Sequence, residues 1–491
     1  MIGYLLPSNC HFAIICIAML NILSAPWLTA SWLTAAELHI GGATVSITPD
    51  APVALSGQMH TRIARTVESP VTATALALES REGDKVLDQA IMVSCDLVAI
   101  RDGILEMVRQ RIQNRLPDFD ISKIVMNATH THTAPVMREE VYELPAEGIM
   151  QPHEYVEFLA DRVADIAVSA WQSRQPGSVG WGLGHAIVAQ NRRSTYSDGT
   201  HQMYGATNRA DFRGIEGYED HGVEVLCFWD GQGKLMATAI NVACPSQEVE
   251  GGTAVNADFW HTVRQSLRTK YGDDLLVLAW TGAAGDQSPH VMYSKPAEER
   301  MRKLRGLTRL EELSRRIVAA WEEAYAGASQ ERHADAELIH IVKTIDLPER
   351  MVTRDEAFAL RAKVSDLSKD PTKKTWVFWH QAAIDRFERQ QAEEPKPFQM
   401  ELHVIRLGDI AIATNQFELF TDYGIQMKAR SPALQTFVIQ LAGPGSYIPS
   451  QRAARGGGYS AIVESNQVGP DGGQALADQT VEVLNILWPA H

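Results

Sequence analysis

Four short apolar segments of this chain each lead directly into a loop rich in glycine and polar side chains, and this arrangement limits the possible folds most strongly. The four pairs of segment and loop are 124–126 with 127–135, 275–280 with 281–290, 410–414 with 415–418, and 437–441 with 442–447. Open α/β sheets carry their sites just past the carboxyl ends of their strands. The sequence therefore predicts that these loops gather at one edge of a sheet and close a common pocket.

Strand-like and helix-like patterns alternate along the chain from about residue 38 onward. The strand candidates are short apolar runs at 73–79, 90–94, 124–126, 223–228, 237–243, 275–280, 338–344, 402–407, 410–414 and 437–441. The helix candidates carry apolar residues at i, i+3, i+4 and i+7 spacing, at 104–116, 156–171, 259–271, 297–325 and 474–487. This order predicts one large α/β catalytic domain, residues 37–491, in which helices flank a mixed central sheet.

Two more polar helices are expected within 353–391, separated by the segment 369–374. Charges that recur along a helix usually mark a face exposed to solvent. We therefore interpret 353–391 as a helical insertion on the surface of the domain.

The N-terminal residues 1–36 have the pattern of an export signal. Residues 12–23 are almost wholly apolar, and the small residues Ala30, Ala35 and Ala36 follow them. No Lys or Arg precedes the apolar run, which departs from the usual signal pattern. The run is also short for a bilayer span. We expect a secreted or periplasmic protein without stable membrane insertion after the signal is removed.

Composition excludes one class of partner and leaves the cysteines without an evident structural role. The formal net charge of the 491 residues is -15, and no basic run with interleaved aromatic residues occurs, so nucleic acid is not expected as a partner. Of the five cysteines, two fall in the expected signal. The other three, Cys95, Cys227 and Cys244, lie in or beside apolar runs, which indicates buried thiols rather than disulfides.

The loop after 124–126 contains the pair His130 and His132. Side chains alternate faces in extended backbone, so the two imidazoles are predicted to point the same way, and neutral imidazole is a common zinc ligand. The other loops add Ser288, Glu418 and Tyr447, which with the histidines could close a metal-centred pocket at the carboxyl ends of the strands. The alternative is a pair of solvated histidines, ordinary glycine-rich turns and a glutamate that only begins a helix.

At these residues the sequence resembles the neutral/alkaline non-lysosomal ceramidase family, and the resemblance covers most of the chain after the signal. The segments that carry it are Val45-Ser46-Ile47-Thr48-Pro49, Ala54-Leu55-Ser56-Gly57, Thr129-His130-Thr131-His132-Thr133, Asn191-Arg192, Gly285-Asp286-Gln287-Ser288-Pro289, Phe417-Glu418-Leu419-Phe420, Tyr447-Ile448-Pro449-Ser450 and Tyr459.

The resemblance implies a zinc enzyme with assigned side chains. His130, Glu418 and Tyr447 would hold zinc. His132, Arg192 and Tyr459 would contact the reacting carbonyl, where such donors stabilise a tetrahedral oxyanion. Zinc with an open position lowers the pKa of bound water to about 7 and polarises a carbonyl.

Ser288 would lie against the site, as a nucleophile or as a group that positions substrate, with its hydroxyl exposed by the glycine-rich turn. No Gly-X-Ser-X-Gly motif surrounds it, which favours a zinc-bound water as the attacking group.

The sequence departs from the family pattern at a second histidine ligand, which would follow an Ala-Cys step. Here Pro245 follows Ala243-Cys244, and proline has no ligand atom in its side chain. We consider Cys244 and His261 as tentative replacements, and Glu248, His221 and His290 as further candidates. A weaker or different metal site is the plain alternative to any replacement.

We also expect no counterpart of the C-terminal immunoglobulin-like domain of the ceramidases after the last predicted helix, and no obvious amphipathic membrane-surface helix occurs. The sequence therefore predicts an exported zinc-dependent hydrolase that cleaves an amide, or an ester, by a metal-activated water. Its substrate would be a small or glycan-linked molecule rather than membrane ceramide. Two different functions stay open on the same sequence: a metal-dependent carbohydrate-active enzyme, a lyase or hydrolase on the same fold, and a non-catalytic secreted protein that binds glycan or lipid.

Overall fold

The computed structural model describes residues 36–394 and 396–488. They belong to one compact unit that spans residues 35–491. The predicted export signal lies almost entirely outside the described residues and stays a prediction. Within the described residues, no helix is both long and apolar enough to cross a membrane.

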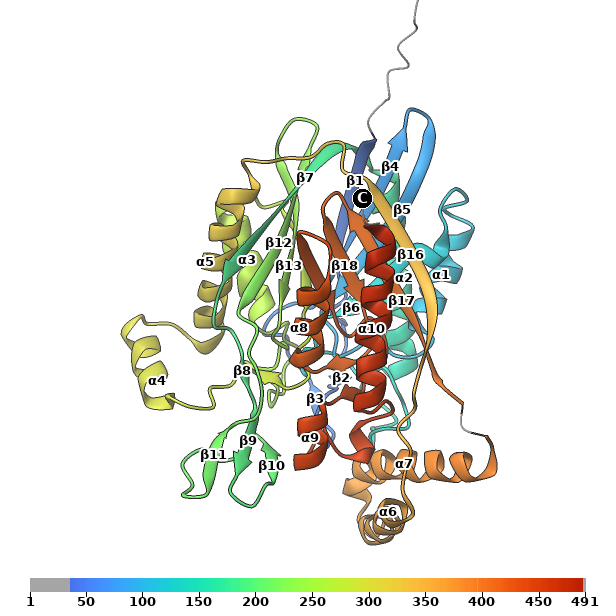
Figure 1. Cartoon of the computed structure of the whole chain (residues 1–491), viewed down its shortest axis with the longest axis vertical. Helices are drawn as coiled ribbons and strands as arrows, with labels where there is room; N and C mark the ends of the chain where they lie inside the picture. The colour runs from blue at the N-terminus through green and yellow to red at the C-terminus, as the bar shows by residue number, and fades with distance from the viewer. Residues whose placement is uncertain (1–35, 395, 489–491) are drawn as a thin grey trace, which may run out of the picture. The chain divides into compact units, whose positions relative to one another are not determined.

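The larger sheet has eight strands in the order β14–β13–β12–β7–β1–β4–β5–β6 (Figure 1). The pairs β13–β14 and β5–β6 are parallel, and the five other pairs are antiparallel. Its strands are β1 (Glu37–Ser46), β4 (Thr72–Glu82), β5 (Lys85–Cys95), β6 (Ile124–Ala128), β7 (Gln175–His185), β12 (Gly222–Asp230), β13 (Leu235–Val242) and β14 (Leu276–Thr281). The predicted mixed sheet in an α/β domain is therefore confirmed.

A second sheet of four strands, which the sequence did not separate from the first, has the order β16–β17–β18–β20. Its strands are β16 (Leu338–Leu347), β17 (Phe398–Leu407), β18 (Ile410–Thr414) and β20 (Gln435–Ile439). Residues from both sheets share one apolar cluster, in which Phe228 and Trp280 meet Ile405 and Phe437. The two sheets therefore pack face to face around the main core.

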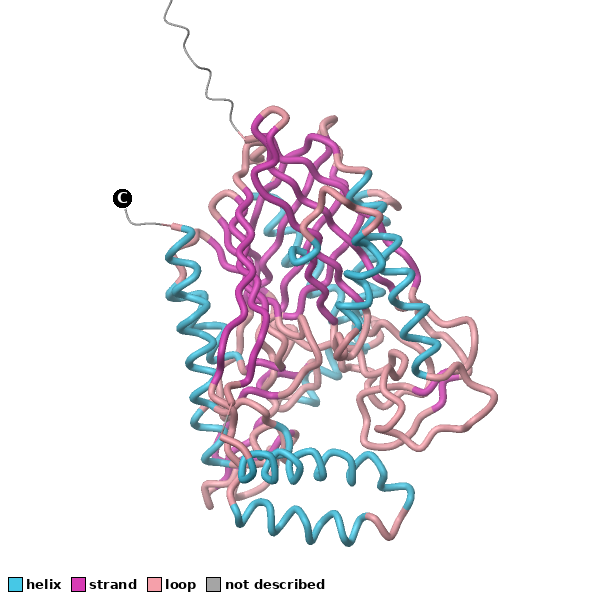
Figure 2. Tube along the Cα trace, turned by 90° about the vertical axis from the view of Figure 1, so that its right-hand side faces the viewer, coloured by secondary structure: helices cyan, strands magenta, loops and turns pink. Residues whose placement is uncertain are grey.

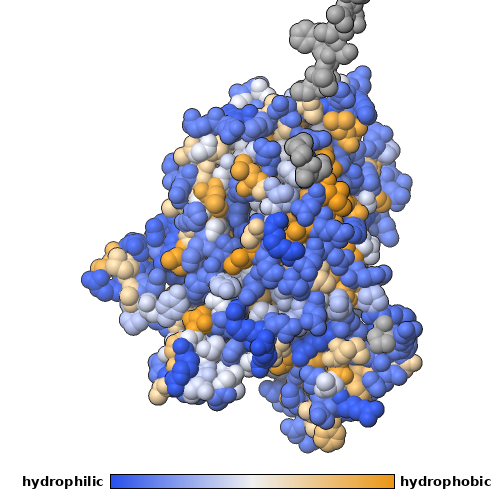
Figure 3. Space-filling view, viewed as in Figure 1, coloured by the Kyte–Doolittle hydropathy of each residue, from blue (hydrophilic) through white to orange (hydrophobic). Residues whose placement is uncertain are grey.

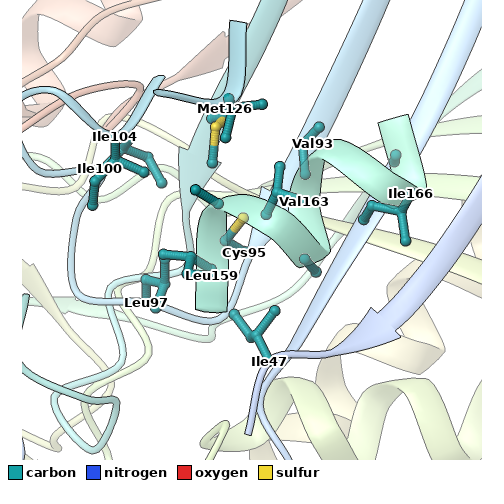
Figure 4. Close-up of a cluster of buried hydrophobic side chains, with 14 of the residues drawn as sticks. Ile47, Val93, Cys95, Leu97, Ile100, Ile104, Met126, Leu159, Val163 and Ile166 are labelled. Carbon is teal, nitrogen blue, oxygen red and sulfur yellow. The ribbon is translucent and has the colours of Figure 1, made fainter. Parts of the chain in front are cut away.

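Helices cover the outer faces of both sheets. The side chains of β4 alternate between the two faces of the larger sheet. Ala75 and Ala77 face the helices, and Leu76 and Leu78 face the second sheet, so both faces are apolar and both are buried. The covering helices are α1 (Ile104–Gln113) and α2 (Pro152–Gln172), α3 (Phe259–Tyr271) and α5 (Arg309–Ala328), and α8 (Thr421–Arg430) and α10 (Pro470–Leu487). Figure 4 shows α2 side chains packed against β5 and β6. Outside these layers, hydrophilic residues cover most of the face seen in Figure 3.

Strand β7 has no counterpart among the predicted strands, because its glycines resemble a turn. Three of them, Gly180, Gly182 and Gly184, face α5, whose backbone carbonyls lie 2.0–2.6 Å from where a Cβ atom would stand. Any larger side chain would push the helix off the sheet. The glycines are thus required by the close approach of α5 to β7.

The single helix predicted over 297–325 is two helices, and that prediction was wrong. Helix α4 (Lys295–Leu304) ends before Gly306, which has a φ of 68°. Helix α5 then begins with a capping box in which the Thr308 side chain accepts from the Glu311 backbone N–H. The left-handed glycine and the new cap outweigh the continuous apolar spacing.

The expected insertion contains α6 (Arg354–Leu367) and α7 (Lys374–Ala392), which lie side by side beyond the long loops (Figure 2). The remaining elements are short. They are β2 (Val53–Ala54), β3 (Ile63–Ala64), β8 (Gln190–Asn191), β9 (Arg193–Tyr196), β10 (His201–Met203), β11 (Phe212–Ile215), β15 (Gln287–Ser288), β19 (Glu418–Leu419), β21 (Tyr447–Ile448), α9 (Gln451–Gly456) and the 3-10 turns Ile121–Lys123, Pro371–Lys373 and Val463–Ser465.

The carboxyl ends of β6, β14, β18 and β20 are joined by backbone hydrogen bonds. Ala128 N–H at the end of β6 donates to Leu441 O (3.2 Å), and Gln440 N–H donates to Thr281 O at the end of β14 (2.9 Å). The Asn415 N–H after β18 donates to Ile439 O in β20 (2.8 Å). The strand ends of two different sheets thus meet at one place, which we call the strand-end junction.

The side chain of Gln440 fixes the strand-end junction. It is fully buried, and its Oε1 accepts from the backbone N–H groups of Ala284 (3.1 Å) and Leu419 (3.0 Å). These contacts fix the loop after β14 against β19.

We predict that Gln440→Leu lowers the free energy of unfolding by about 2–4 kcal/mol, because two buried N–H groups lose their acceptor. Urea denaturation measures the change. Gln265→Leu, at an exposed position of α3, is the matched control and should change stability by less than about 0.5 kcal/mol. Equal stability of the two variants would show that the Gln440 side chain does not hold the junction.

Candidate functional site

His130 is fixed in an unusual backbone conformation just past β6. Its φ is 67°, in the left-handed region, so the extended geometry assumed from the sequence was wrong. Its backbone N–H donates to Leu97 O (2.9 Å), and its ring Nδ1 lies 2.6 Å from Val98 O. A carbonyl can only accept, so Nδ1 carries the proton and the Nε2 lone pair is free for another partner.

The His130 lone pair faces two groups. Its Nε2 is 3.2 Å from Glu418 Oε2 and 3.4 Å from His132 Nε2. The structure therefore brings both histidines to one point, as expected, although through a left-handed turn rather than through a strand.

Glu418 and Tyr447 are neighbours because β19 and β21 pair in parallel, with the two residues opposite each other. Burial raises the pKa of Glu418, but the surrounding His130 ring, Tyr447 hydroxyl and Arg192 guanidinium together outweigh this effect, so the net pKa lies below its ordinary value. The glutamate is ionised at neutral pH. Burial raises the pKa of the Tyr447 hydroxyl, which is therefore a neutral phenol unless a cation displaces its proton.

Arg192 connects the loops of the site. Its Nη2 donates to Tyr447 OH (3.1 Å) and Gly285 O (3.0 Å), and its Nη1 donates to Gln247 Oε1 (3.0 Å). Its backbone N–H donates to Asp286 O (2.8 Å). The guanidinium is thus held beside the phenol of Tyr447 by loops that follow β13, β14 and β20.

Gln247 is the residue that sequence reasoning missed. It follows β13, and its Oε1 is committed to Arg192, so its amide N–H₂ donates to His132 Nε2 at 2.7 Å. The hydrogen-bond pattern then places the proton of His132 on Nδ1, which faces Glu250 Oε2 at 3.4 Å. Its position past a strand end, the signal that marked the other loops, would have identified it.

The two tentative replacement ligands, Cys244 and His261, have other surroundings. Cys244 lies in the apolar cluster under α3 and α5, and burial raises its thiol pKa well above the ordinary value, so it is not a thiolate. His261 lies on α3, where Arg264 and Asp96 are its charged neighbours. Within 36–394 and 396–488, neither side chain forms a hydrogen bond or ion pair with His130 or Glu418.

The three further ligand candidates, Glu248, His221 and His290, each contact a charged side chain instead. Glu248 lies 3.3 Å from Arg309, His221 lies 3.5 Å from Glu219, and the His290 ring is 3.7 Å from Glu250.

Ser288 is fully buried, so the exposed hydroxyl expected from its turn was wrong. Its Oγ accepts from the His290 backbone N–H (3.0 Å) and lies 3.0 Å from Tyr204 OH. Tyr204 OH in turn accepts from Arg192 Nη1 (3.3 Å). Ser288 therefore reaches the site through Tyr204 and Arg192.

A pocket of about 190 Å³ opens beside these residues. One of its walls contains Gly57, where a Cβ atom would stand 2.3 Å from the His132 ring. Another wall contains Trp379 of α7. The Tyr459 ring lies between this wall and the site, with its centre 5.5 Å from the centre of the Trp379 ring and 5.8 Å from that of the Tyr447 ring. The segment 353–391, which the sequence indicated to be a solvent-exposed insertion, thus supplies one wall of the pocket through α7.

The donors present fit a zinc ion in part. Ligands of a tetrahedral zinc with bonds of about 2.0–2.1 Å lie about 3.3 Å apart, close to the 3.2 Å between His130 Nε2 and Glu418 Oε2. A free lone pair and a carboxylate at this distance favour a cation between them. Among the described residues, no group of three or more His, Cys, Asp and Glu side chains is placed to hold a metal, so the phenol of Tyr447 would be needed as a third ligand.

Two solved structures share this fold. The neutral ceramidase from Pseudomonas aeruginosa matches with a TM-score of 0.67 at 17% sequence identity, over 92% of this chain and 74% of that chain. A ceramidase complexed with C2 matches with a TM-score of 0.65 at 14% identity, over 92% and 75% of the two chains. No family model and no curated protein matches the chain. The predicted neutral ceramidase-like fold is thereby confirmed.

Proposed function

We propose that this protein is an exported, zinc-dependent hydrolase that cleaves an amide, or an ester, bond in a small or glycan-linked substrate. The observation that carries the proposal is the convergence of His130 Nε2 and the Glu418 carboxylate beside Tyr447, Arg192 and a pocket. The ceramidase-like fold supports the same reaction class, because the similar structures are of ceramidases. The export signal itself stays a prediction.

His130, Glu418 and Tyr447 would hold the zinc ion. When bound there, zinc would act as a Lewis acid that lowers the pKa of water and polarises a carbonyl.

The chain supplies donors for the charge that develops on the reacting carbonyl oxygen. Arg192 is always charged and is held by four partners, so it needs little rearrangement to stabilise an oxyanion. Burial raises the pKa of Tyr459, which keeps its phenol protonated and able to donate. The His132 Nε2 atom accepts a hydrogen bond from Gln247. This atom can therefore take up a proton only when the hydrogen bond to Gln247 breaks.

The pocket favours short substrates. Its volume of about 190 Å³ is below the roughly 300–1,000 Å³ of sites for drug-sized ligands. Its apolar wall residues, among them Val136, Met137 and Phe378, suit a short acyl chain. A short acyl group would fill this volume.

The proposal is tested with a panel of N-acyl amides and esters of increasing acyl length, together with ceramide in micelles and uronate-containing oligosaccharides. We expect hydrolysis of short acyl amides or esters, at least about tenfold lower kcat/KM for long-chain ceramide, and loss of turnover on chelation with recovery on adding zinc. An unsaturated or cleaved sugar with no acyl hydrolysis would favour a carbohydrate-active enzyme. Binding without any turnover would favour a non-catalytic binding protein.

The role of Ser288 is tested by a double-mutant cycle. Because Ser288 contacts Arg192 only through Tyr204, we expect Ser288→Ala and Tyr204→Phe each to lower turnover by about tenfold, the scale of one lost hydrogen bond. The double variant should be little worse than either single one, since both act on the same chain of contacts. Zinc content should not change.

Two results would overturn this assignment. An acyl adduct on Ser288, detected by mass spectrometry, would make it the nucleophile. Fully additive losses would show that Ser288 and Tyr204 act separately.

A further inference from the structure

Arg101 lies on the pocket wall in the loop that orients His130. Val98 O, three residues earlier, binds the His130 ring, and the Ile100 N–H donates to Gly443 O (3.0 Å), which fixes the loop against the residues after β20. The Arg101 side chain is held at its tip, where Nη1 donates to Pro444 O at 2.5 Å. Both ends of this arginine are therefore anchored beside the site.

Arg101 has no carboxylate partner among the described residues, which distinguishes it from its neighbours. Arg138 lines the same pocket but pairs with Asp102 (2.6 Å), and Arg109 pairs with Glu401 (2.5 Å). Burial, and next to it the charge of Arg138, lowers the pKa of Arg101 to about 10, so the group stays charged at neutral pH. The carboxylates of Glu418 and Asp102 attract Arg101 only from a distance, and a partly buried charge that no carboxylate contacts directly favours binding of an anion.

The free part of the guanidinium has the right form for a carboxylate. Nη1 is engaged by the carbonyl of Pro444, and within the described part of the chain Nε and Nη2 make no hydrogen bond. This edge presents two parallel N–H donors, the arrangement that binds a carboxylate in a bidentate manner.

The rest of the pocket is suited to an apolar group rather than to a carboxylate. Met59, Val136, Met137 and Phe378 give it an apolar wall, while Gly57 brings it against His132. A molecule that fills the pocket next to the site would thus present a short apolar part and an acidic part. An acylated amino acid has both, on either side of its amide bond.

We propose that the substrate is an acidic amide of the N-acyl amino acid class, whose carboxylate pairs with Arg101. This inference rests on the proposed hydrolase function and specifies its substrate class. It makes Arg101 a specificity-determining residue that binds substrate away from the scissile bond.

The test compares N-hexanoylglycine with N-hexanoylglycinamide, which differ in the charge of one group. We expect wild-type kcat/KM to be about 10- to 100-fold higher for the acid, the range for hydrogen bonds to a charged group. The preference should shrink as ionic strength rises. Arg101→Met should bring the ratio of the two kcat/KM values close to one, and Arg101→Lys should restore part of it.

Arg361→Met is the matched control, because Arg361 pairs with Glu388 on the α6–α7 surface. The ratio of the two kcat/KM values in this variant should equal the wild-type ratio. Calorimetric binding of N-hexanoylglycine to wild type and Arg101→Met separates this inference from the proposed function. If neither compound is hydrolysed but binding weakens at least tenfold in Arg101→Met, the hydrolase proposal fails and the carboxylate site stands. Equal binding and equal kcat/KM ratios in wild type and Arg101→Met would overturn the carboxylate site, as would a preference lost only in Arg138→Met.

Discussion

The strand-end junction is the constraint on which the site depends. β6 and β14 are opposite edge strands of the larger sheet, yet the side chains of Ser94 in β5 and Asn127 in β6 both donate to Ala279 O of β14, at 2.6 Å and 3.1 Å. The eight-stranded sheet therefore curves until its edges meet, and β20 of the second sheet joins them there. Loops that are far apart in the sequence lie close together, because the strands that precede them end at the same place.

The geometry of the site follows from this junction. The loop after β13 contacts the histidine loop through the Ser246 N–H, which donates to Thr129 O (3.1 Å), and this places Gln247 between His132 and Arg192. The buried Asp286 accepts from Thr421 Oγ1 (2.7 Å) and Asn191 Nδ2 (2.7 Å), which fixes the chain at Arg192. His130, His132 and Arg192 are thus oriented by buried polar contacts, and this part of the site needs little reorganisation to bind charge.

Sequence reasoning predicted the fold class and the gathering of the loops, because both follow from apolar periodicity and from where strands end. It could not predict the left-handed turn at His130, which depends on the carbonyls of Leu97 and Val98. Local sequence also gave no sign that α7 borders the pocket. These features depend on contacts between segments distant in the chain, which periodicity does not encode.

The proposed function depends on a cation that binds between His130 and Glu418. Anomalous scattering recorded at the zinc absorption edge from crystals of the zinc-loaded protein would locate this cation. We expect one anomalous peak within bonding distance, about 2.0–2.2 Å, of His130 Nε2 and the Glu418 carboxylate, with Tyr447 as a further neighbour. A peak at Cys244 or His261, or no peak near His130, would contradict it.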